Sequence, residues 1–62
     1  MFSMNKLVES GILTVSFHVH ADFVNVITTA SWSVAGHTAF TYSKEEARKV
    51  WKRLAAAGFV RA

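Results

Sequence analysis

The chain has 62 residues, of which 52% are hydrophobic, with a formal net charge of +3, no cysteine and no proline. This length predicts a single small domain over residues 1–62 without a deep substrate cleft, and the missing cysteines exclude disulfides and thiolate metal sites. No apolar run approaches the roughly 20 residues of a membrane span, and no signal-type segment opens the chain, so we expect a cytoplasmic protein without a membrane partner.

The first ten residues give an ambiguous signal. Residues 3–10, SMNKLVES, are compatible with a short helix that ends at Gly11. Two helical turns are marginally stable without tertiary contacts. The sequence therefore leaves open whether this segment is helical.

Three strands are predicted next, at about 12–20, 23–33 and 38–42. In the first, Leu13, Val15, Phe17 and Val19 alternate with polar residues, as in a half-buried strand. A two-residue turn at 21–22 would pair Val19 with Val24 and keep the apolar residues of both strands on one face.

The second hairpin allows two registers. A two-residue loop at 35–36 would place Phe40 opposite Ser31. A three-residue loop over 34–36, with Gly36 in a bulge, would pair Ala30 with Phe40 and Trp32 with Thr38. We favour the second register, because it gathers the aromatic residues on one face.

The last element is a predicted amphipathic helix at about 44–57. Ser43 and Glu46 form a capping box, and Gly58 stands where a helix commonly ends. The predicted fold class is α+β: a three-stranded antiparallel β-meander with the C-terminal helix packed on one face, with or without the short N-terminal helix. We expect the core to hold Trp32, Phe40, Tyr42 and Trp51, which argues against an exposed base-stacking platform.

The segment HVHAD, residues 18–22, is the part of the sequence that most resembles a set of metal ligands. His18, His20 and Asp22 alternate, as zinc ligands on one side of a strand could. The segment is similar to the His-x-His-x-Asp core of the metallo-β-lactamase superfamily, whose motif continues with a histidine where this chain has Phe23. The similarity covers five residues, so no metal, cofactor or activity is assigned, and these three residues stay weak candidates.

The sheet face away from the helix is predicted to lack Lys, Arg and Glu. Its expected members are Ile12, Thr14, Ser16, His18, His20, Phe23, Asn25, Ile27, Thr29, Ser31, Ser33, His37, Ala39 and Thr41. A solvated face usually carries charges, so this composition favours a partly covered face. The residues expected to form an interaction face are Ile12, His18, His20, Phe23, Asn25 and Ile27. The alternative is an ordinary exposed surface of residues with high strand propensity.

The helix gathers most of the positive charge. Its candidate nucleic-acid contacts are Lys44, Arg48, Lys49, Lys52 and Arg53. The segment SKEEARKV is similar to the helix start of double-stranded RNA-binding domains, although Glu45 replaces the second lysine of their basic cluster. A solubilising helix exterior explains the same residues.

No catalytic constellation is found, so we expect a protein that is not an enzyme. The first functional hypothesis is a small interaction module, accessory or inhibitor-like, that forms a homodimer or docks on a protein partner through the interaction face. The alternative is nucleic-acid binding through the basic helix.

Overall fold

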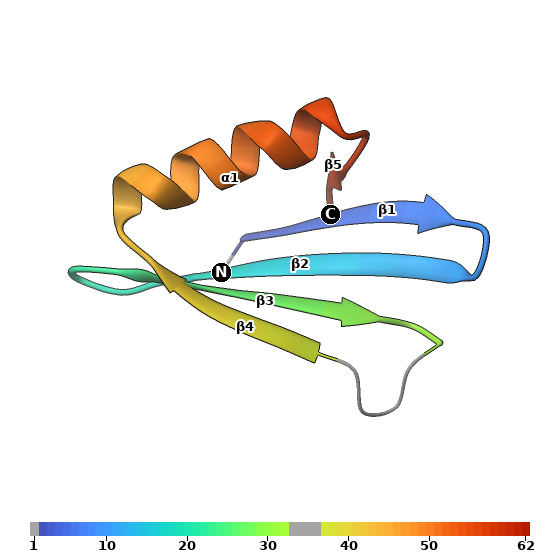
Figure 1. The fold of residues 1–62 in the computed structure, drawn as a ribbon, viewed down its shortest axis with the longest axis horizontal. Coiled ribbons are helices and arrows are strands. Elements are labelled where there is room, and N and C mark those ends of the chain that lie inside the picture. The colour runs from blue at the N-terminus through green and yellow to red at the C-terminus, as the bar shows by residue number, and fades with distance from the viewer. Residues whose placement is uncertain (1, 33–36) are drawn as a thin grey trace.

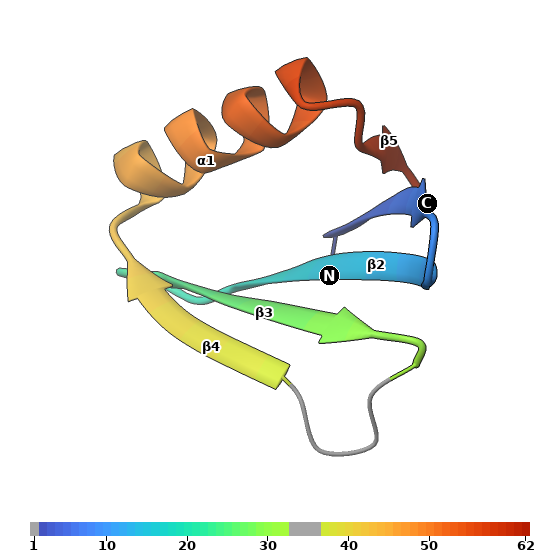
Figure 2. The same ribbon diagram turned by 45° about the vertical axis from the view of Figure 1, so that its right-hand side comes forward.

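The computed structural model describes residues 2–32 and 37–62. Its elements are β1 (Phe2–Val8), β2 (Gly11–Val19), β3 (Val24–Ala30), β4 (His37–Tyr42), α1 (Lys44–Ala56) and β5 (Val60–Arg61). The strands form one antiparallel sheet in the order β4-β3-β2-β1-β5, and α1 crosses one face of it (Figures 1 and 2). The α+β class is confirmed, but the described residues form five strands where a three-stranded meander was predicted.

The N-terminal segment is a strand, so the alternative of a short helix over 3–10 is wrong. All seven residues of β1 pair with β2, from Phe2 opposite Phe17 to Val8 opposite Gly11. The Met4 side chain is 2% exposed and belongs to the core. Pairing along the whole strand and burial of Met4 outweigh the helix propensity of Lys, Leu and Glu in this segment.

The first predicted hairpin register is confirmed. Val19 pairs with Val24, Phe17 with Val26 and Leu13 with Ala30. The amide of His20 also donates to the carbonyl of Phe23 at 2.9 Å, which closes the turn.

The favoured register of the second hairpin is wrong by four residues, and the rejected two-residue loop is wrong as well. Phe40 pairs with Val26 rather than Ala30, and Tyr42 pairs with Val24. The residues of the predicted loop, 34–36, lie outside the described part of the chain. The helix supplies the physical reason for this register. Because only Ser43 separates Tyr42 from the start of α1, β4 must end beside the start of β3 for the helix to reach the core.

The helix begins and ends as predicted to within one residue. Ser43 Oγ accepts a hydrogen bond from the Glu46 amide at 3.1 Å, and the Glu46 carboxylate accepts one from the Ser43 amide at 3.2 Å. Ala57 is the C-terminal cap, and Gly58 follows with a φ of +100°. The left-handed backbone at this position favours glycine and turns the chain back toward β5.

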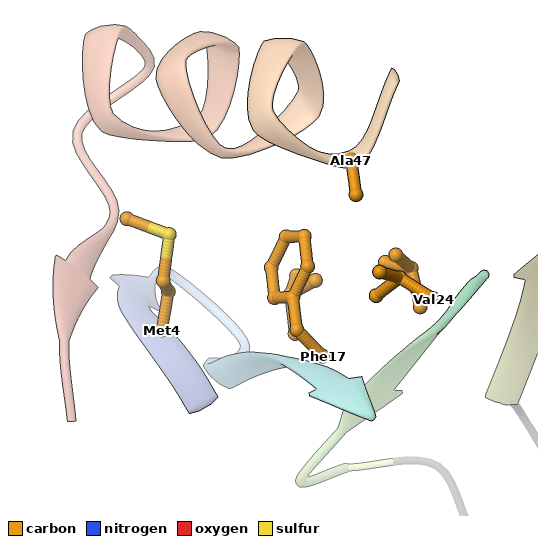
Figure 3. Close-up of a cluster of buried hydrophobic side chains, with 6 residues drawn as sticks. Met4, Phe17, Val24 and Ala47 are labelled. Carbon is orange, nitrogen blue, oxygen red and sulfur yellow. The ribbon is translucent and has the colours of Figure 1, made fainter. Parts of the chain in front are cut away.

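A small hydrophobic core lies between α1 and the sheet. Its buried members are Met4, Val15, Phe17, Val24, Val26 and Ala47. Figure 3 shows Ala47 reaching down from the helix toward Phe17 and Val24, with Met4 farther along β1. The Trp51 ring packs edge-on against Phe17 with centroids 5.1 Å apart.

Two of the four aromatic residues predicted for the core are largely outside it. Tyr42 and Trp51 pack against the core, but Trp32 is 49% and Phe40 55% exposed. The helix starts at one end of β4 and crosses toward β1 (Figure 1). Within residues 2–32 and 37–62, no helix has the length and apolar character needed to cross a membrane.

Candidate functional site

The sheet face opposite α1, which we call the open face, is covered by no described element (Figure 2). Strand alternation and pairing register assign it the residues Ser3, Asn5, Leu7, Ile12, Thr14, Ser16, His18, Asn25, Ile27, Thr29, Ala39, Thr41 and Val60, with His20 and Phe23 in the adjoining turn. None of the strand residues is Lys, Arg, Asp or Glu, whereas Asp22 lies in the turn between His20 and Phe23 and is exposed. The side chain of His37, and Ser33, which was also expected here, fall outside the part that can be described.

One end of the open face holds a chain of polar contacts. The Thr41 hydroxyl donates to Asn25 Oδ1 at 3.0 Å, and Asn25 Nδ2 lies 3.3 Å from His20 Nε2. Because Oδ1 is the acceptor from Thr41, the amide nitrogen is left to donate to His20 Nε2. The His20 ring also stacks on Phe23, with centroids 4.5 Å apart. The structure thus brings together His20, Phe23 and Asn25 as the sequence predicted, and places His18 opposite Asn25.

The metal candidates do not form a compact ligand set. His18 is on β2, whereas His20 and Asp22 lie beyond the end of that strand. His20 Nε2, a nitrogen that a metal could bind, is already within hydrogen-bond distance of Asn25. No group of three or more His, Cys, Asp or Glu residues suited to a metal ion is found in the described ranges.

The other end of the open face is apolar, and sequence reasoning missed two of its three residues, Leu7 and Val60. Leu7 of β1 pairs with Ile12 of β2, and their exposed fractions are 80% and 44%. Val60 of β5 is 65% exposed and pairs with Asn5. The alternation of Phe2 and Met4 with Ser3 and Asn5 was the available signal for β1.

The middle of the open face is a row across four strands. Ile27 on β3 lies between Ser16 of β2 and Ala39 of β4. The hydroxyls of Ser16 and Ser3 are 3.3 Å apart, so one of them donates a hydrogen bond to the other. Ile27, half-buried, is therefore the largest apolar group at the centre of a neutral surface.

The five predicted nucleic-acid contacts are all exposed on the helix, on the side of the molecule opposite the open face. Lys44 and Arg48 lie one turn apart beside the start of β1 and β5, where they line a groove with Arg61. Lys49, Lys52 and Arg53 lie outside that groove. The structure thus divides the predicted basic surface into two groups.

Comparison of the chain with protein-family models, curated proteins and solved structures gives no match.

Proposed function

We propose that this protein is a non-enzymatic interaction module of the cytoplasm that pairs with a second copy of itself through the open face. The observation that supports the proposal is the lack of formal charge on the described strand residues of this face, although the chain has seven Lys and Arg and four Asp and Glu residues. Apolar side chains stand at its centre and at both ends.

A second copy is the partner that this composition favours. In a symmetric pair the same surface faces itself, so a charged face would meet a like charge at close range. The open face avoids this repulsion, whereas two helix faces with five bases each would repel. Serine and threonine hydroxyls can both donate and accept, so they are also compatible with their own copies.

The size of the open face bears on the expected strength of the dimer. Strands of seven to nine residues at ~3.3 Å per residue, spaced ~4.8 Å apart, give a face of roughly 25 by 19 Å. This area is at the small end of specific interfaces, which bury about 800 Å² per partner. We therefore expect a dimer with a Kd of about 1–100 μM rather than an obligate one.

The test is sedimentation equilibrium of the wild type and an Ile27→Glu variant. The wild type is expected to reach twice the chain mass of 6.9 kDa. Ile27→Glu buries two unpaired carboxylates in the pair and is expected to weaken it at least about 100-fold. The matched control is Ala56→Glu, which adds the same charge on the exposed helix side. A wild-type monomer at millimolar concentration, or equal effects of the two variants, contradicts the proposal.

The alternative function is nucleic-acid binding through Lys44, Arg48, Lys49, Lys52 and Arg53. All five are exposed, and their positive charges could contact a phosphate backbone. An electrophoretic shift that disappears with added salt and in the Lys49→Glu/Arg53→Glu variant would support it. No shift at low salt would rule it out.

A further inference from the structure

The groove between the N-terminal half of α1 and the sheet has a different chemistry from the open face. It measures about 540 Å³ and is lined by Phe2, Phe17, Val19, Val24, Lys44, Ala47, Arg48, Trp51 and Arg61. This volume lies within the usual range of small-molecule sites, about 300–1,000 Å³. We propose that the groove binds a free single-chain carboxylate, with its alkyl chain on the apolar floor and its head group among the three cations.

The floor of the groove is apolar and partly open. Phe17, Val24 and Ala47 form its buried base, with exposed fractions of 4%, 4% and 6%. Phe2 and Val19 at the sides are 46% and 51% exposed, so a ligand can still cover much of their surface. Burial of that surface against an alkyl chain supplies an apolar driving force.

The rim carries positive charge from two segments far apart in the sequence. Lys44 and Arg48 come from α1, and Arg61 comes from β5, where its guanidinium lies 5.7 Å from the centre of the Phe2 ring. None of the four acidic residues of the chain lines the groove. The acids of the first helical turn, Glu45 and Glu46, are not among the lining residues, and Glu46 is bonded to the Ser43 amide. A carboxylate head group would therefore meet cations without a competing acid in the lining.

The same lining disfavours a nucleobase or a sugar. Both present several donors and acceptors that need partners when they are buried. The polar side chains that line the groove, Trp51 and the three cations, are all donors, and none of the lining side chains is an acceptor. A carboxylate requires only donors at one end, and an alkyl chain requires none.

The test uses decanoate as the probe and Trp51 as the reporter. A Trp32→Phe background leaves Trp51 as the single tryptophan, and titration is followed by its fluorescence and by calorimetry. Saturable binding of one decanoate per chain, with shifts of Phe2, Val19 and the Trp51 indole in amide and indole NMR spectra, supports the site. No saturable binding up to about 1 mM overturns it.

Matched arginine variants decide whether the cations of the groove matter. Arg48→Gln is expected to raise the Kd for decanoate about three- to fivefold, whereas Arg53→Gln, an equal charge loss outside the groove, leaves it nearly unchanged. Val19→Glu, at a half-exposed site in the groove, is expected to abolish binding. Equal effects of the two arginine variants, or equal affinity for decyltrimethylammonium, overturn the proposal.

Two further measurements separate this site from the other surfaces. Because the groove and the open face are on opposite sides of the sheet, Ile27→Glu is expected to bind decanoate as the wild type does, whatever its effect on the dimer. Binding to phosphatidylglycerol vesicles or to oligothymidylate without binding of free decanoate would assign the cations to a membrane surface or a nucleic acid, and would reject the free carboxylate.

Discussion

The two faces of the sheet are built from the same strands, yet their residues differ in burial and in what they contribute to the stability of the fold. On the face under α1, five sheet residues from β1, β2 and β3 are almost fully buried, and their burial provides the core. On the open face, the same strands present Ser, Thr, Asn, His and a few aliphatic residues, all of them at least partly exposed. Stability therefore depends mainly on the covered face, which leaves the open face free to be selected for association.

The largest expected loss of stability follows from truncating a side chain on the covered face. Phe17→Ala removes the ring that contacts Trp51 at the centre of the core, and we expect a loss of about 3–5 kcal/mol in the free energy of unfolding. Since a domain of this size has roughly 5 kcal/mol in total, this variant is expected to be largely unfolded. Urea denaturation followed by circular dichroism measures it. Ile27→Ala, at monomer concentrations, is the control and is expected to cost less than about 1 kcal/mol; a larger cost than for Phe17→Ala would reverse the assignment of the faces.

A smaller loss of stability is expected from a substitution at Gly11, on the part of the covered face that extends beyond the helix. Gly11 has a φ of +145°, and a β-carbon there would meet Ser31 Oγ and lie 3.0 Å from Trp32 Cε3. Ser31 Oγ also accepts a hydrogen bond from the Ile12 amide at 2.9 Å. We expect Gly11→Ala to destabilise the fold by about 1–3 kcal/mol, through backbone strain and displacement of these two side chains.

Thermal unfolding tests this variant against Gly58→Ala. The β-carbon at Gly58 would meet only the Lys6 side chain, at 3.6 Å, although the φ of +100° still carries strain. Equal losses for the two variants would mean that the contacts with Ser31 and Trp32 add nothing.

Substitution in the capping box of Ser43 and Glu46 tests how much the start of α1 contributes to the stability of the fold. Ser43→Ala removes the acceptor for the Glu46 amide, and we expect a loss of about 1 kcal/mol in the free energy of unfolding. Chemical denaturation checks the value, and Ser43→Asp, which preserves an acceptor, is the control. A similar loss with aspartate would show that the cap is not the source of the effect.

The smallest effect is expected from the polar contacts of the open face. Asn25→Ala breaks the contacts to Thr41 and His20, but these groups can bond to water in the monomer, so we expect a loss of no more than about 0.5 kcal/mol. The dimer is expected to be more sensitive than the fold, which sedimentation and denaturation together would show. A loss above about 2 kcal/mol would show that Asn25 stabilises the fold as strongly as residues of the covered face do.

The elements with a strong local signal were predicted well from the sequence. Ser43, Glu46 and Gly58 mark the helix ends by their own backbone chemistry, and the alternation from Leu13 to Val19 fixes the face of β2. The register of β2 and β3 follows because a one-residue slip would expose every core residue.

The remaining features depend on contacts between distant segments. A four-residue shift of β4 keeps Phe40 on the same face, so apolar alternation cannot distinguish the two registers; only the position of the helix start does. In β1, Met4 is the single core residue, and Lys6 donates to the carbonyl of Ala57 at 2.7 Å, a contact that no local pattern encodes. The polar end of the candidate association surface was accordingly predicted, while Leu7 and Val60 were not.

The pairing of β1 with β5 joins segments from opposite ends of the chain, with Met4 opposite Arg61 and the Ala62 amide bonded to the Ser3 carbonyl at 2.9 Å. During synthesis, β1 therefore keeps one unpaired edge until residues 60–62 have left the ribosome. An unpaired edge next to exposed Leu7 is a template for strand addition from another chain. The two residues of β5 pair with Met4 and Asn5, so they protect the middle of β1 from such addition rather than the edge beside Leu7.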